Sequence, residues 1–326
     1  MHQAHFPSLR RSNDSTHAHR STNGPSTSTA QHSILPRPDV LHSHLFCSSL
    51  NQKKIITQKM TATDPTLPHP RILCLHGGGV NATIFRLQCR TLLTLLSPTF
   101  RLVFANAPYP CPPHAAITSV YGASHGPCYR WLRYEDHHEA VTAQEASRAV
   151  LQVCRDAMDA DDDAGATGEW VGVLGFSQGA KIAASLLWLA GWLDPRPLPR
   201  PMGMDVRLRF GVFMAGSAPV ALLDPKGELE GERPRGVDTA ETVGMRFEEW
   251  PETREGEHAI GLPTLHVHGL QDPGVVRHRR MMELYCKEGT TRLVKWDGGH
   301  RLPFKSSDVQ LVVDGILEMA RETGVL

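Results

Sequence analysis

Gly175-Phe176-Ser177-Gln178-Gly179 spells G-x-S-x-G, and the flanking residues give that spelling a structural meaning. The apolar stretch Trp170–Leu174 before it is typical of a buried strand, and the Ala- and Leu-rich stretch Ala180–Leu193 after it is typical of a helix. A serine on a sharp strand-to-helix turn has its hydroxyl lifted above the edge of a sheet, and glycines two residues before and after leave space for the turn. The pattern predicts that Ser177 is a nucleophile, and the alternative is an incidental serine in a Gly-rich loop.

Strands and helices alternate along the rest of the chain. Short apolar stretches predict six strands, at Arg71–Leu75, Arg101–Ala105, Val171–Gly175, Phe210–Ala215, Thr264–His268 and Thr291–Trp296. Apolar residues at helical spacing predict helices between and after them, over Phe85–Leu96, Ala146–Ala157 and Val309–Met319. Such alternation favours right-handed crossovers and parallel pairing. We therefore expect the α/β class, with a mostly parallel sheet of at least six strands and helices on both faces.

The first part of the chain differs in composition from the rest of its 326 residues. Most of the stretch 1–68 is rich in Ser, Thr, His and Pro and shows no apolar periodicity. A segment of this composition cannot bury enough apolar surface to fold. We expect a disordered extension over 1–68 and one α/β domain over 69–326. A mitochondrial presequence is an alternative for the extension, although no amphipathic helical pattern supports it. Because Met60 stands just before the first strand, the segment preceding it is expected to be dispensable.

Charge, hydropathy and cysteine content exclude several classes of protein. Lys plus Arg and Asp plus Glu balance at 34 each, so no basic excess points to nucleic acid or to a membrane surface. The longest apolar stretch, between Lys181 and Asp194, is too short to span a bilayer, and no secretory signal is evident. Seven cysteines without framework spacing indicate reduced thiols. We expect a cytoplasmic protein without a membrane span.

A nucleophilic serine needs a base, and the base needs an acid that orients it. In α/β-hydrolases the acid and then the histidine follow the serine along the chain, each after a late strand. Asp272 follows the predicted strand Thr264–His268, and His300 follows the final one, Thr291–Trp296. These positions predict Asp272 as the acid and His300 as the base. Asp297 is the rival acid, but it precedes His300 on the same loop and is poorly placed to orient that ring.

The loop after the first strand is expected to complete this site. His76-Gly77-Gly78-Gly79 follows Arg71–Leu75, and glycine permits a backbone N–H to turn inward. A tetrahedral intermediate carries an oxyanion that needs backbone donors already in place. We expect an oxyanion hole formed by the N–H groups of Gly78 and Gln178. A Gly-rich turn without a donor role is the alternative.

Two long segments interrupt the alternation of strands and helices. Tyr109–Tyr134 carries prolines and aromatic residues, and Leu222–Gly261 is acidic and rich in Pro and Gly. Long loops of this kind are often lids or binding loops. For Leu222–Gly261 a surface insertion without a role is an equal alternative.

Other clusters of polar residues have simpler interpretations. His266 and His268 share a strand face and could bind a metal, but no third ligand stands at convincing spacing, so a packing role is favoured. Asp161-Asp162-Asp163 is expected to form a solvated loop rather than a calcium site.

Taken together, these motifs resemble the FSH family of fungal serine hydrolases, which are α/β-hydrolases. The resemblance runs from about Arg71 to the C-terminal helix and carries the family triad onto Ser177, Asp272 and His300. The stretches that carry it are Arg71–Gly77, Gly126-Pro127 with Trp131, Gly175–Gly179, Pro263–Gly269 with Asp272, and Gly298–His300. Asn106 departs from the pattern, because the family usually has Asp before Ala-Pro, but this position lies outside the triad. Some members of the family release polyketide acyl chains from synthases in secondary metabolism.

We therefore expect an α/β-hydrolase that cleaves carboxylic esters or thioesters through an acyl-enzyme, with no metal or organic cofactor. Its expected partner is a small-molecule acyl ester or thioester, and the resemblance implies a hydrophobic or polyketide-type acyl group, which could be attached to the carrier protein of a synthase. An acyltransferase using the same acyl-enzyme is one alternative. A non-catalytic binding protein on a hydrolase scaffold is another.

Overall fold

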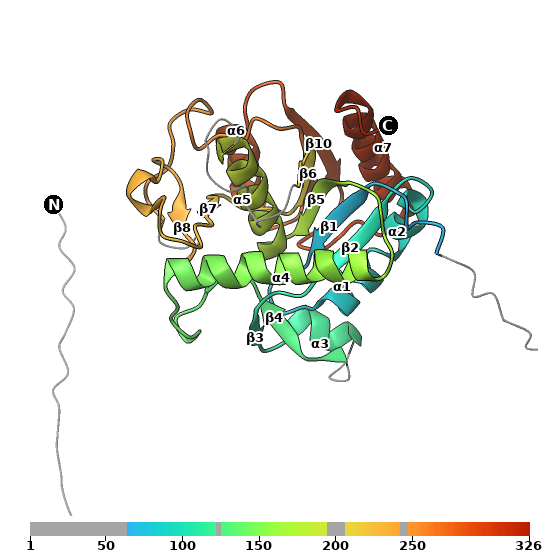
Figure 1. Cartoon of the computed structure of the whole chain (residues 1–326), viewed down its shortest axis with the longest axis horizontal. Helices are drawn as coiled ribbons and strands as arrows, with labels where there is room; N and C mark the ends of the chain where they lie inside the picture. The colour runs from blue at the N-terminus through green and yellow to red at the C-terminus, as the bar shows by residue number, and fades with distance from the viewer. Residues whose placement is uncertain (1–63, 122–124, 194–205, 242–246) are drawn as a thin grey trace, which may run out of the picture. The chain divides into compact units, whose positions relative to one another are not determined.

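In the computed structural model, which describes residues 64–121, 125–193, 206–241 and 247–326, the centre of the fold is a parallel sheet of six strands (Figure 1). The strands are β1 (Arg71–Leu75), β2 (Arg101–Ala105), β5 (Trp170–Phe176), β6 (Phe210–Met214), β9 (Thr264–Gly269) and β10 (Thr291–Trp296). Their order is β10-β9-β6-β5-β1-β2, and every neighbouring pair is parallel. The prediction of the α/β class is confirmed, and the predicted strand ends lie within one residue of the observed ones.

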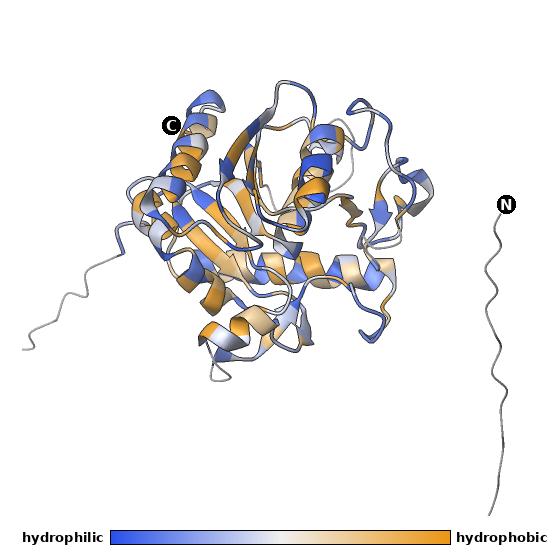
Figure 2. Ribbon diagram, turned by 180° about the vertical axis from the view of Figure 1, so that it is seen from behind, coloured by the Kyte–Doolittle hydropathy of each residue, from blue (hydrophilic) through white to orange (hydrophobic). Residues whose placement is uncertain are grey.

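Helices cover both faces of the sheet. One face carries α1 (Ala82–Gln88), α2 (Arg90–Leu96) and α7 (Ser306–Glu322), and the other carries α4 (Ala143–Asp163), α5 (Gln178–Leu193) and α6 (Val275–Tyr285). Phe85, Leu92 and Val312 belong to the core on the first face, while Val150, Leu187 and Met281 belong to the core on the second. The hydropathy colouring shows largely apolar strands between these layers (Figure 2). Apolar burial on both faces explains why the strands lack polar alternation.

The order of the strands determines where a site can form. The chain passes from β1 to β2 on one side and then crosses to β5 on the other side of β1. The loops after β1 and β5 therefore diverge at a topological switch point, where open α/β sheets bind ligands at the carboxyl ends of their strands. His76–Gly79 and Ser177 occupy these two loops.

The predicted helix over Phe85–Leu96 is interrupted at Cys89. This residue has φ −83° and ψ 7°, so it separates α1 from α2. Phe85, Cys89, Leu92 and Leu96 are all buried, so the apolar face that predicted the helix continues through the interruption.

The segment Tyr109–Tyr134 contains more regular structure than the sequence indicated. It forms β3 (Tyr109–Cys111) and β4 (Cys128–Arg130), which pair antiparallel, and helix α3 (Ala115–Tyr121) between them. The backbone of Tyr129 exchanges hydrogen bonds with the loop after β1, donating to Val80 O (2.7 Å) and accepting from Gly79 N (2.9 Å). The segment is thereby held beside the loop at the carboxyl end of β1.

The segment Leu222–Gly261 was expected to be a lid, a binding loop or a surface insertion without a role, and its described part packs on α5. Its Leu223 and Val237 are fully buried in the core that contains this helix. The indole of Trp188 donates to the carbonyl of Glu257 (2.7 Å). Short elements β7 (Ala221–Leu222), η3 (Glu230–Glu232) and β8 (Asp238–Thr239) lie along the segment, and residues 242–246 lie outside the described part. This cover explains why α5 is apolar on nearly all sides.

The expectation that Asp161-Asp162-Asp163 forms a solvated loop is wrong, because these residues are the last turn of α4. Asp161 is 7% exposed and binds the guanidinium groups of Arg71 (3.4 Å) and Arg101 (2.8 Å) at the starts of β1 and β2. Arg101 also pairs with Asp64 (2.6 Å). Residues 64–68, which the composition assigned to the extension, are mostly in turns, and the rest of the extension, residues 1–63, lies outside the described residues.

No helix in the described ranges is both long and apolar enough to cross a bilayer.

Candidate active site

Ser177 lies on a sharp turn between β5 and α5. Its φ is +54°, a left-handed conformation that is costly for a residue with a side chain and that is typical of strained functional turns. The flanking glycines are required by close backbone approach. A Cβ on Gly175 would overlap the carbonyl oxygen of Gly179, and a Cβ on Gly179 would overlap the carbonyl oxygen of Leu75. The G-x-S-x-G spacing is therefore explained by the packing of this turn against β1.

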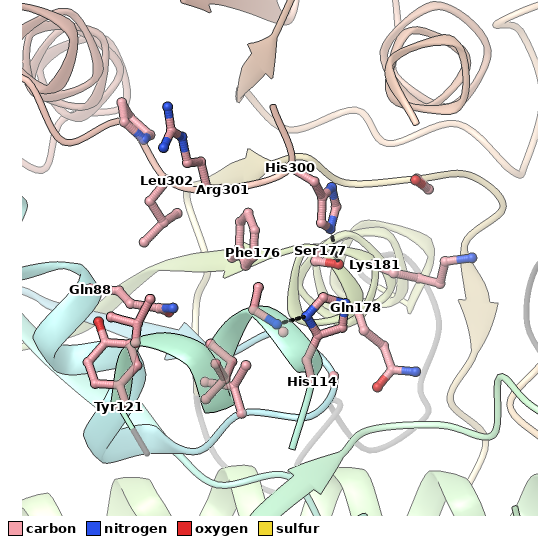
Figure 3. A pocket seen from close by; sticks show the side chains of 18 of the residues that line it. Gln88, His114, Tyr121, Phe176, Ser177, Gln178, Lys181, His300, Arg301 and Leu302 are labelled. Atoms are coloured by element: carbon pink, nitrogen blue, oxygen red, sulfur yellow. Dashed lines mark hydrogen bonds between the residues drawn. The ribbon is translucent and has the colours of Figure 1, made fainter. Parts of the chain in front are cut away.

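Ser177, His300 and Asp272 meet at the carboxyl ends of their strands. The His300 ring lies with Nε2 at 2.8 Å from Ser177 Oγ (Figure 3). Its Nδ1 lies 2.7 Å from Asp272 Oδ2. A neutral imidazole protonated on Nδ1 donates to Asp272 and leaves Nε2 free to accept the serine proton. The arrangement has the geometry of a hydroxyl nucleophile, a base and an orienting acid.

Asp272 is held in one orientation by the start of α6. Its side chain is 1% exposed, and Oδ1 accepts a hydrogen bond from Gly274 N (2.8 Å), so Oδ2 remains directed at His300. The rival acid, Asp297, is exposed and accepts from the Gln271 side-chain amide (2.7 Å). The geometry therefore favours Asp272 over Asp297 as the partner of His300.

His278 was not singled out by the sequence, because it is one polar residue within an amphipathic helix. Its side chain is 1% exposed, and Nδ1 lies 3.9 Å from Asp272 Oδ2. Burial lowers the pKa of the His278 imidazole to about 4, although Asp272 acts in the opposite direction. The ring is therefore neutral at neutral pH, and Asp272 can serve His300 without a second cation beside it.

Gly78 and Gln178, the predicted oxyanion donors, line the same pocket as Ser177. Within the described residues, no backbone hydrogen bond is recorded from either N–H group. Gln178 is also the first residue of α5, where N–H groups lack partners in the helix and favour negative charge. Both groups thus have unused donor capacity near the serine.

The loop that carries Gly78 is held by a buried network that includes His76 and Trp131. His76 Nε2 accepts from Ala107 N (3.0 Å), and the Trp131 indole donates to the His76 carbonyl (2.7 Å). Burial lowers the pKa of the His76 imidazole to about 4, so it acts here as a neutral acceptor. The Gln178 side chain continues the network by accepting from Trp131 N (2.7 Å). The local motif H-G-G-G marked the loop, but its partners come from distant parts of the chain.

A pocket of about 730 Å³ opens over Ser177, a size typical of small-molecule sites. Figure 3 shows Phe176 beside Ser177, with Tyr121 and Leu302 farther to the left. Helix α3 contributes Ile117, Val120 and Tyr121 to the wall. The segment Tyr109–Tyr134 therefore lines the pocket over Ser177, and its role in binding a ligand stays a prediction.

Among the residues that the structure describes, two groups of side chains have the proximity that a metal ion needs. Asp272, His278 and His300 form one, and Glu135, His137 and His138 form the other, each with ligand atoms within 4.8 Å of one another. The first group coincides with the candidate active site. His266 and His268 belong to neither group: both are buried, and His266 Nε2 lies 3.1 Å from Thr264 Oγ1, in keeping with the packing role that was favoured.

Comparisons with known proteins agree on one family. The family model described as "Serine hydrolase (FSH1)" matches residues 66–312. Esterase dbaE of Emericella nidulans is 47% identical over 266 residues, which is 81% of this chain and 95% of dbaE. Esterase pigG of Monascus ruber is 47% identical over 82% of this chain and 97% of its own. Esterase claE of Penicillium crustosum is 43% identical over 81% of this chain and 98% of its own.

Proposed function

Because the chain belongs to the FSH1 family of serine hydrolases, we propose that it cleaves ester or thioester bonds through Ser177, His300 and Asp272. The observation that carries this assignment is the continuous hydrogen-bonded line from Ser177 Oγ through His300 to Asp272 Oδ2. Three named esterases that align over most of the chain support the same activity.

In the proposed mechanism, Ser177 Oγ attacks the acyl carbon while His300 Nε2 accepts the hydroxyl proton. Asp272 accepts the Nδ1 hydrogen bond and stabilises the imidazolium that forms. Collapse of the tetrahedral intermediate breaks the bond to the leaving group, which takes the proton from His300. Water then repeats the sequence on the acyl-enzyme and releases the carboxylic acid and Ser177.

The oxyanion of each tetrahedral intermediate is assigned to the backbone N–H groups of Gly78 and Gln178. Their unused donor capacity and the position of Gln178 at the start of α5 support this assignment. The buried network of His76 and Trp131 keeps the Gly78 loop in place before the substrate arrives. Removal of one such donor in other enzymes costs about two to three orders of magnitude in kcat.

The proposed acyl group is hydrophobic, in keeping with the wall made by Ile117, Val120 and Tyr121. The resemblance to polyketide-releasing members of the family extends the proposal to a polyketide-type acyl chain, presented free or on the carrier protein of a synthase. We place the activity in the cytoplasm, on the evidence of seven cysteines without the spacing of a disulfide framework. The catalytic domain is assigned to residues 69–326, with residues 1–68 as an extension.

Acyl transfer is the second candidate function, since an alcohol or amine can replace water on the same acyl-enzyme. The volume of the pocket, about 730 Å³, leaves room for a second small reactant. Product analysis with an added alcohol distinguishes the two activities, because transfer yields a new ester whereas hydrolysis yields only the acid.

Covalent labelling tests the assignment of the nucleophile. We expect a fluorophosphonate probe to label the wild-type protein, and the Ser177→Ala variant to lose both the labelling and the hydrolysis of a 4-nitrophenyl ester while keeping its circular dichroism spectrum. A matched change at another serine of the pocket, Ser119→Ala, should keep the labelling. Labelling that persists in Ser177→Ala would show that another residue is the nucleophile.

A further inference from the structure

The pocket above Ser177 has a one-sided charge. Among the described residues that line it, Arg90, Lys181, Arg277 and Arg301 are cationic, and none is Asp or Glu. The whole chain is balanced, with 34 basic and 34 acidic residues, so this excess is local. A cleft lined by one sign of charge concentrates ligands of the opposite sign.

Two of these cations belong to the helices that begin after Ser177 and after Asp272. Lys181 is one helical turn beyond Ser177 on α5 and is 8% exposed, and Arg277 is in the first turn of α6. Burial lowers the pKa of the Lys181 ammonium to about 7, with Asp238 acting in the opposite direction and the charge of Arg277 adding to the lowering. Both side chains line the same pocket, so an anion bound there can interact with both of them.

Apolar side chains line another part of the pocket. Figure 3 shows Lys181 extending away from Ser177 on the right, and Tyr121 and Leu302 on the left. Ile117 and Val120 of α3 line the pocket together with Tyr121. Ser177 therefore lies between Lys181 and the apolar residues of α3, which suit a hydrocarbon chain, and Arg301 stands beside Leu302 on the left of the view.

We propose that the substrate is amphiphilic, with an anionic group bound by Lys181 and Arg277 and an apolar part bound by α3. This inference rests on the proposed ester-cleaving function and adds the charge and the orientation of the substrate. A carboxylate on the acyl part or a phosphate on the leaving part would supply the same chemistry, because both accept charge-assisted hydrogen bonds from ammonium and guanidinium groups. We call Lys181 and Arg277 the cation pair.

Isosteric substrates test the proposal on the wild-type protein. Mono-4-nitrophenyl adipate and 4-nitrophenyl hexanoate differ only by a carboxylate in place of a methyl group. S-hexanoyl-4′-phosphopantetheine and S-hexanoylpantetheine are the same thioester with and without a phosphate. We expect a kcat/KM at least about tenfold higher for the anionic member of one pair, with a preference that weakens as salt rises. The pair of substrates that shows the preference identifies whether the anion belongs to the acyl part or to the leaving part of the natural substrate.

Variants of the cation pair link the preference to these residues. Arg277→Gln and Lys181→Met should each lower, by about tenfold, the ratio of kcat/KM for the anionic substrate to kcat/KM for the neutral substrate. The dependence of this ratio on salt concentration should be lost as well. Arg279→Gln is the matched control, because Arg279 is an exposed arginine on the same helix that does not line the pocket. In Arg279→Gln, the ratio of the two kcat/KM values should stay at the wild-type value. If Lys181→Met fails to fold, Arg277→Gln still tests the proposal.

Two results would overturn the inference, and neither is the failure of the ester-cleaving function itself. Equal kcat/KM for both members of both pairs would show that the pocket does not select an anion. An equal fall of the ratio in Arg277→Gln and Arg279→Gln would show an effect of net charge rather than of the cation pair. In contrast, failure of every ester and thioester to be hydrolysed would contradict the proposed function instead.

Discussion

Ser177 carries a conformational cost at the turn where the nucleophile is proposed. A left-handed backbone at a serine costs of the order of 1–3 kcal/mol. A side chain at Gly175 or Gly179 would overlap neighbouring backbone atoms, so only glycine fits at these two positions of the turn. The strained residue is also the one whose hydroxyl reaches His300. At the scale of single residues, strain and hydrogen bonding therefore point to the same serine.

Replacement of the two candidate acids distinguishes their roles. Asp272→Asn should lower kcat by about three to four orders of magnitude, because the amide cannot accept the Nδ1 hydrogen bond with a negative charge and His300 loses its orienting partner. Asp297→Asn is the control on the neighbouring loop and should cost far less, since Asp297 binds Gln271. Steady-state kinetics on a 4-nitrophenyl ester measures both. A larger loss in Asp297→Asn would show that the acid was assigned to the wrong residue.

Helix α3 is the element that shapes the acyl side of the pocket. It is short, so it depends on tertiary contacts such as those of Ile117 with Val80 and Ile84 rather than on its own helix propensity. The β3–β4 pair and the backbone bonds of Tyr129 hold both of its ends beside the active site. The position of the element, more than its sequence, makes it part of the pocket.

Chain-length selectivity tests the role of α3. We expect kcat/KM to rise from acetyl to medium-chain esters, since each buried methylene contributes about 0.8 kcal/mol. Val120 is 72% exposed and lines the pocket, so Val120→Asp should weaken this rise without disturbing the core. Leu311→Asp, a change on α7 away from the pocket, is the control and should leave the rise unchanged. A fall beyond acetyl in the wild type would indicate a small closed pocket, and amidase activity should be negligible throughout.

Several buried imidazoles lie in the interior of the domain, and those of His266, His268 and His278 form one row of ring contacts. Burial lowers the pKa of His76, His268 and His278 to about 4 and that of His266 to about 3. These values lie below the ordinary 6.5, so between about pH 6.5 and pH 4 the unfolded chain binds more protons than the folded one. The contribution of these groups to stability is complete above pH 6.5 and is lost as the pH falls.

Denaturant titrations at several pH values check this dependence. We expect the urea midpoint to decrease from pH 7 to pH 4.5, and His268→Gln to reduce the slope of the free energy of unfolding against pH. His137→Gln is the control, because the His137 side chain is 65% exposed and should leave the slope near that of the wild type. A midpoint that rises toward low pH in the wild type would contradict the assignment.

The composition of the first residues makes a separate prediction about the whole chain. A protein that begins at Met60 should keep its melting temperature and its kcat/KM within error, because a segment rich in Ser, Thr, His and Pro contributes little apolar burial. It also retains Asp64, which pairs with Arg101. Thermal unfolding and ester hydrolysis measure both quantities, and a large loss of either would mean that residues 1–59 stabilise the domain or complete the site.

The sequence by itself determined the strands of the sheet, their parallel pairing and the loops that carry Ser177, Asp272 and His300. These features follow from local patterns: continuous apolar stretches for strands, and polar residues directly after them. Since the carboxyl ends of parallel strands share one edge, residues that follow such strands are brought together without further information. The catalytic roles of these residues and of the donors Gly78 and Gln178 remain predictions for the experiments above.

Only the tertiary structure decided which groups surround those loops. His278 lies near Asp272 because α6 begins directly after that residue, and Asp161 becomes buried because two strands begin where a helix ends. Lys181 lines the pocket and is nevertheless buried. Burial and charge environment depend on contacts between residues far apart in the chain, and no local pattern encodes them.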